Sequence, residues 1–69
     1  MSIFSERILA LRDERKLSQA ALAKEVGITS RTYQRYEAGE REPLMSTLVR
    51  MADFYGVSMD YLAGRTDTK

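Results

Sequence analysis

Apolar residues recur three or four positions apart along most of this chain, with polar residues between them. This spacing is typical of amphipathic helices, and little of the sequence alternates as a strand does. Five helices are predicted: residues 5–15, a short helix that stops at Gly27, residues 29–37, a helix between Pro43 and Gly56, and residues 59–63. The sequence therefore predicts an all-α fold of five short helices.

The helix between Pro43 and Gly56 has an apolar stripe that predicts which of its residues face the core. The stripe comprises Met45, Leu48, Met51, Ala52 and Tyr55. The four methionines of the chain are interpreted in the same way, as residues that fill the core.

Three of the predicted helices begin after a hydroxyl residue that is a good N-cap, since its oxygen accepts a backbone N–H of the first turn. These residues are Ser18, Thr29 and Ser58. An apolar residue precedes each cap and can pack against another five positions later, which is the pattern of a hydrophobic staple. The expected pairs are Leu17 with Leu22, Ile28 with Tyr33, and Val57 with Leu62.

The composition limits the chemistry that this chain can perform. Its 69 residues are expected to form one small domain, residues 1–63, followed by a short, frayed tail, residues 64–69. The chain has no cysteine and no histidine, so it lacks thiolate ligands, the commonest zinc ligand and the commonest general base. With no glycine-rich phosphate loop either, we expect no enzymatic activity, no cofactor, no metal site and no small-molecule ligand. No signal peptide or membrane-spanning run is visible, so we expect a cytoplasmic protein without a membrane partner.

The net charge of +1 does not by itself indicate a nucleic-acid-binding protein. The charges are unevenly distributed, however. From residue 12 to residue 35 there are six basic and three acidic residues, whereas acidic residues predominate in the later part of the chain. The positive excess is therefore modest and local.

The stretch "GITSRTYQRYEAG" places Arg31 and Arg35 four positions apart, on neighbouring turns of one predicted helix. Like charges at this spacing repel each other by a few tenths of a kcal/mol, and no acidic residue on the same face offsets this. Tyr33 and Tyr36 lie on the opposite face, as expected of a helix anchored in a core. The pattern predicts a helix that binds an anion; a merely solvated face is the alternative.

Two short helices joined by a glycine turn are typical of a helix-turn-helix. The segments "LSQAALAKEVGITSRTYQRYEAGEREP" and "LVRMADFYGVSMDYLAG" also resemble the lambda-repressor-like helix-turn-helix family, the Cro and xenobiotic-response-element type. The resemblance covers about residues 4–64 and implies a compact five-helix domain whose third helix enters the major groove of DNA. Two positions depart from many relatives: Leu44 replaces a serine cap, and Ala21 replaces the glutamate of a capping box.

The resemblance also implies which residues contact double-stranded DNA. Gln19 is expected to hydrogen-bond a phosphate, and further contacts are expected from Thr29, Ser30, Arg31, Thr32, Gln34, Arg35 and Tyr36. Ser30 and Thr32 are also good first-turn residues of any helix, and the Tyr36 hydroxyl is as well suited to the core as to a phosphate. Tyr33 is expected in the core. Arg12 and Glu37 are expected to form an ion pair between the first and third helices.

A sequence-specific DNA-binding transcriptional regulator, most simply a repressor, is the function predicted. A small interaction module that binds an acidic protein partner, of the antitoxin or adaptor type, is the alternative. One short recognition helix contacts few base pairs, so we expect a homodimer on an inverted-repeat operator. The resemblance points to the C-terminal helix for the dimer interface, with Met59, Tyr61 and Leu62 as candidates; the alternative is that these residues only complete the core.

Overall fold

A computed structural model describes residues 2–69 and contains five helices and no strand in that range. The helices are α1 (Ile3–Glu14), α2 (Gln19–Glu25), α3 (Ser30–Glu37), α4 (Met45–Tyr55) and α5 (Met59–Ala63). The predicted all-α fold of five helices is confirmed. No helix within residues 2–69 has both the length and the apolar character needed to span a membrane.

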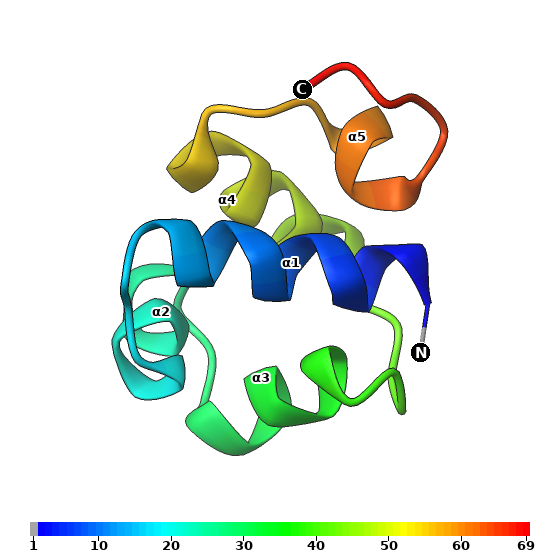
Figure 1. The fold of residues 1–69 in the computed structure, drawn as a ribbon. Helices are drawn as coiled ribbons and strands as arrows, with labels where there is room; N and C mark the ends of the chain where they lie inside the picture. Colours follow the sequence, from blue (N-terminus) through cyan, green and yellow to red (C-terminus); the bar gives the residue numbers. More distant parts are fainter. Residues whose placement is uncertain (1) are drawn as a thin grey trace.

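Helix α1 runs through the middle of the molecule, with α2 and α3 on one side and α4 and α5 on the other (Figure 1). It packs against both α3 and α5, while α2 packs against α3 and α4 against α5. Helix α3 lies at the lower edge of the view in Figure 1, with no other helix beyond it. One side of α3 is therefore open to solvent.

Every helix contributes at least one side chain that is completely buried. These residues are Ile8 from α1, Leu22 from α2, Tyr33 from α3, Met51 from α4 and Leu62 from α5, each 0% exposed. Burying a side chain of this size contributes about 1.5–3 kcal/mol. The five short helices thus share one core, and none of them is stable by itself.

The three predicted N-caps are present. Ser18 accepts the N–H of Ala21 at 3.0 Å, Thr29 that of Thr32 at 3.1 Å, and Ser58 that of Tyr61 at 3.0 Å. The apolar residues that precede these caps, Leu17, Ile28 and Val57, are half-buried against the core. Helix α2 is followed by Gly27, where the sequence predicted that this helix stops. Its φ of 74° is the left-handed conformation that glycine favours just after a helix.

Helix α1 begins two residues earlier than predicted, at Ile3. Ser2 is its N-cap, and Ser2 and Ser5 form a reciprocal capping box: the N–H of Ser5 lies 3.1 Å from Ser2 Oγ, and the N–H of Ser2 lies 2.9 Å from Ser5 Oγ. Serine here takes the place of the more usual glutamate or glutamine three residues after the cap.

The methionines do not all fill the core. Met51 is buried, but Met45 is 72% exposed and Met59 is 40% exposed. The prediction that Met45 belongs to a core-facing stripe is therefore wrong. Met45 and Met59 are the first residues of α4 and α5, whereas the core contacts of these helices begin with later residues. Met1, the fourth methionine and the first residue of the predicted domain, lies outside the described residues.

Residues 64–69 fold back on the helices, which differs from the expected frayed tail. The Arg7 guanidinium donates hydrogen bonds to the carbonyls of Tyr61 and Thr66 and lies 2.8 Å from the Asp67 carboxylate. The N–H of Ser58 also donates to the carbonyl of Lys69 at 3.0 Å. These contacts hold the tail beside α5 and the first half of α1, on the far side of the molecule from α3 (Figure 1).

Candidate nucleic-acid interface

The two faces of α3 have different environments. Tyr33, Tyr36 and Glu37 are buried, whereas Arg31, Gln34 and Arg35 are exposed. Within residues 2–69, the side chains of Arg31 and Arg35 have neither a hydrogen bond nor an ion pair. The exposed face of α3 therefore presents two free guanidinium groups beside a free carboxamide.

Thr29 and Thr32 stand at the first turn of α3 and share a hydrogen bond. The Thr29 hydroxyl accepts the N–H of Thr32 and donates to the Thr32 hydroxyl oxygen at 2.9 Å. Each hydroxyl has a single proton and rotates freely, so one of the two protons lies between Thr29 and Thr32 and the other is left for an outside acceptor.

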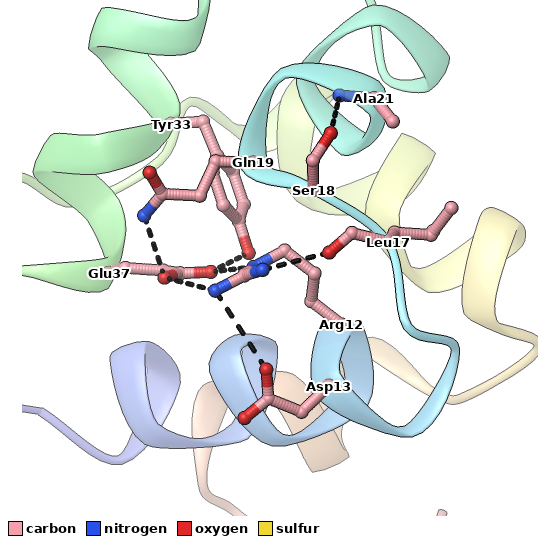
Figure 2. A network of polar contacts seen from close by, with 8 residues as sticks. All are labelled: Arg12, Asp13, Leu17, Ser18, Gln19, Ala21, Tyr33 and Glu37. Carbon is pink, nitrogen blue, oxygen red and sulfur yellow. Dashed lines mark hydrogen bonds and ion pairs between the residues drawn. The ribbon is translucent and has the colours of Figure 1, made fainter.

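Glu37 is the only acidic residue of α3, and it does not face solvent, being 6% exposed. Figure 2 shows three side chains that converge on its carboxylate from three helices. Arg12 of α1 donates from Nε to Oε2 at 2.6 Å and from a terminal nitrogen to Oε1 at 3.1 Å. Gln19 of α2 donates to Oε1 at 3.0 Å, and the Tyr33 hydroxyl donates to Oε2. The predicted ion pair of Arg12 and Glu37 is thus present, within a larger network.

The network keeps the buried carboxylate ionised. Burial alone raises the pKa of Glu37, but the hydrogen bonds from Arg12, Tyr33 and Gln19 together outweigh it and hold this pKa below its ordinary value of 4.5. Burial also raises the pKa of the Tyr33 hydroxyl, so it stays protonated and acts as a donor. Because the only acid of α3 is buried and paired, the exposed charge of this helix is entirely positive.

Gln19, the first residue of α2, is half-buried beside α3. One N–H of its side-chain amide points to Glu37, while its carbonyl oxygen points away from Glu37 (Figure 2). The sequence prediction assigned Gln19 to a phosphate contact and did not anticipate this bond. Its second N–H and its carbonyl have no partner within residues 2–69.

Two tyrosines of α3 belong to the core. Tyr33 is completely buried, as predicted. Tyr36 is 2% exposed and packs edge-on against Phe4, with ring centroids 6.0 Å apart. Because its ring is enclosed between helices, only the hydroxyl of Tyr36 is available for a DNA contact, and this contact stays a prediction.

The candidates for a dimer interface are in three different situations. Leu62 is completely buried, so its inclusion was wrong: its side chain is needed in the core. Tyr61 is half-buried, and the Arg7 guanidinium covers its ring at 4.2 Å from the centroid. Of these three candidates, only Met59 has an exposed side chain.

Sequence reasoning missed an exposed apolar pair, Leu44 and Met45, at the start of α4. Leu44 is 63% exposed and occupies the N-cap position, where its side chain makes no capping bond. The sequence did contain a signal for this feature. Leu44 stands at an N-cap position, which favours serine or threonine, and its apolar side chain cannot make a capping hydrogen bond there.

The sequence of this chain is similar to those of known proteins. Residues 8–62 match the family model described as helix-turn-helix. The chain is 42% identical over 60 residues to the uncharacterized HTH-type transcriptional regulator YqaE of Bacillus subtilis, a match that covers 87% of this chain and 52% of that protein. It is 38% identical over 66 residues to the cryptic phage CTXphi transcriptional repressor RstR of Vibrio cholerae, covering 96% and 60%. The chain thus spans about half to three fifths of the length of these curated relatives.

Solved structures show the same fold. The P22 c2 repressor, in complex with a synthetic operator, superposes with a TM-score of 0.84 and 35% identity, covering 90% of this chain and 94% of that one. A transcriptional regulator from Listeria innocua has a TM-score of 0.84 and 31% identity, with coverages of 88% and 57%.

Proposed function

Since this chain belongs to the helix-turn-helix family whose model matches residues 8–62, we propose that it binds double-stranded DNA in a sequence-specific manner and regulates transcription, acting as a repressor in the cytoplasm. The observation that carries the proposal is the exposed face of α3, with its unpaired Arg31 and Arg35 and its only acid buried. Guanidinium groups that are free of internal partners can contact guanine edges or phosphates.

Each residue of this surface has a proposed role. Arg31, Gln34 and Arg35 contact base edges in the major groove, and Thr32 and Gln19 donate to phosphates. Ser30, half-buried in the first turn, and Thr29, through its backbone, complete the surface. Base contacts confer sequence preference, whereas phosphate contacts position the protein on any duplex. The alternative, an interaction module for an acidic protein, is not favoured, because the relatives are named as transcriptional regulators and repressors.

The protein is further proposed to bind as a homodimer with two-fold symmetry. Two copies of α3 then enter the major groove one helical turn apart, about 34–36 Å. Helix α3 must remain free for DNA, so the dimer surface lies elsewhere. The exposed apolar side chains available for it include those of Leu44, Met45 and Met59.

We expect two protomers to saturate one palindromic site. The site is obtained by selecting bound sequences from a random duplex library. The protein is then titrated onto the palindrome and onto an isolated half-site, with the stoichiometry measured in each case. One protomer saturating the palindrome, with the affinity of the half-site, contradicts the dimer. Selection that enriches no sequence contradicts specific DNA binding.

Leu44→Ser is expected to stabilise the folded protomer and to weaken the dimer. Serine at this N-cap can accept the N–H of Thr47, as Ser18 accepts that of Ala21, so the free energy of unfolding should rise by about 0.5–2 kcal/mol. The same change removes exposed apolar surface, so cooperative binding to the palindrome should weaken. The control is Leu44→Ala, which removes that surface without adding a cap and should weaken the dimer without the gain in stability. Unchanged cooperativity in both variants eliminates Leu44 from the interface.

A further inference from the structure

The Glu37 carboxylate determines which way the Gln19 side-chain amide is turned. An ionised carboxylate only accepts hydrogen bonds, so the NH₂ group of Gln19, and not its carbonyl, must face Glu37. The bond of 3.0 Å between Gln19 Nε2 and Glu37 Oε1 has this arrangement. The amide of Gln19 is therefore held with one N–H inward.

The carboxylate itself is held in place by other donors. Arg12 contacts both of its oxygens, and the Tyr33 hydroxyl donates to Oε2. Arg12 is further fixed by a hydrogen bond of 2.8 Å to the carbonyl of Leu17, two residues before Gln19. Figure 2 shows these groups around one point where α1, α2 and α3 meet. Glu37 is thus a rigid acceptor, and its orientation does not depend on Gln19.

We propose that Glu37 is a positioning residue for phosphate binding: it holds the Gln19 side-chain amide so that the second N–H is directed to a phosphate oxygen of DNA. This inference rests on the proposed function. A free glutamine side chain on a surface samples several rotamers and loses this freedom when it binds. Glu37 removes that freedom before DNA arrives, so the contact forms with a smaller entropic loss.

The test compares the DNA affinity of proteins with and without the Glu37 carboxylate, all of equal net charge. Arg12→Met together with Glu37→Met removes one positive and one negative charge, and it leaves no unpaired buried charge. Gln19→Ala removes the amide. The third variant combines all three substitutions. Affinity is measured for the selected site and for a scrambled duplex, at a temperature where circular dichroism shows every variant to be folded.

Both the Gln19→Ala variant and the Arg12→Met, Glu37→Met variant are expected to bind each duplex roughly three- to tenfold more weakly than the wild type. The ratio of the two affinities should stay unchanged, because a phosphate contact carries no sequence information. In the Gln19→Ala background the other two substitutions should have no further effect on affinity, although they still change the stability. This lack of additivity distinguishes positioning of Gln19 from a structural role.

Tyr33→Phe is the matched control, because it removes another hydrogen bond to Glu37 without touching Gln19. It should lower the stability and leave the affinity for DNA unchanged. The inference is overturned if the Arg12→Met, Glu37→Met variant retains the wild-type affinity. It is also overturned if these two substitutions weaken DNA binding by the same factor in the wild-type and Gln19→Ala backgrounds. It is also overturned if Gln19→Ala has no effect. Failure of the wild-type protein to bind any duplex instead contradicts the proposed function.

Discussion

Replacement of Arg12 with alanine is expected to lower the free energy of unfolding by about 3–5 kcal/mol. Arg12 makes the two-pronged contact with Glu37, at 2.6 and 3.1 Å, and its loss leaves a carboxylate that is 6% exposed without the cation that pairs with it. A domain of this size has a total stability of roughly 3–10 kcal/mol, so the variant should be close to unfolded at room temperature. Urea denaturation followed by circular dichroism measures the change.

The paired variant Arg12→Met, Glu37→Met is the control for this prediction. It removes both charges, so no unpaired charge stays buried, and apolar side chains of similar volume take their place. It should therefore be destabilised less than Arg12→Ala. A loss for Arg12→Ala below about 1 kcal/mol, the value of an exposed pair, contradicts the partly buried position of this ion pair.

The pH dependence of stability provides an independent view of the same pair. The pKa of Glu37 is lower in the folded protein than its ordinary value of 4.5, because the three hydrogen-bond donors outweigh the effect of burial. The contribution of Glu37 to stability is therefore fully present above that value, and it decreases as the pH falls below it and the carboxylate takes up a proton. In the paired variant this part of the acid-induced loss should be absent.

Arg31→Ala and Arg35→Ala are expected to have the second large effect, a loss of DNA sequence specificity. Each should weaken binding to the selected site, and at least one should lower the discrimination against scrambled DNA by about 1–3 kcal/mol, the contribution of a two-pronged arginine–guanine contact. Both side chains are exposed and without internal partners in the part of the chain that the structure describes, so stability should hardly change. The measurement is the ratio of the two affinities at fixed salt concentration.

Arg65→Ala serves as the control for the loss of one positive charge. Arg65 is exposed in the tail, which lies on the opposite side of the molecule from α3 (Figure 1). Its replacement should change the affinity for the selected site and the affinity for scrambled DNA only by the small effect of net charge. If neither arginine of α3 alters the specificity ratio more than Arg65 does, the exposed face of α3 does not contact bases.

The features that were predictable from the sequence depend on neighbours along the chain. The caps at Ser18, Thr29 and Ser58 involve residues three positions apart, and the left-handed Gly27 follows directly from the end of α2. The resemblance to Cro-type helix-turn-helix proteins, now confirmed, added what local patterns do not contain, namely the pairing of Arg12 with Glu37 across 25 positions.

The features that escaped prediction depend on how the helices cross. The sequence places Tyr36 on the core-facing side of α3, but it does not say that Phe4 will pack edge-on against its ring. In the same way, the periodicity of α5 does not reveal that Leu62 is enclosed. The bond from Gln19 to Glu37 exists only because α2 and α3 bring their side chains together beside Arg12. Such contacts require the tertiary structure.

The division of α3 into two faces has a consequence for the evolution of this chain. The residues that anchor the helix, Tyr33, Tyr36 and Glu37, are all buried, and the exposed Arg31, Gln34 and Arg35 share no hydrogen bond with them. Mutations at the exposed positions can therefore accumulate without loss of the fold. Under the proposed function, a duplicated copy can change its preferred operator in a few steps, while the buried positions preserve the geometry that every such descendant inherits.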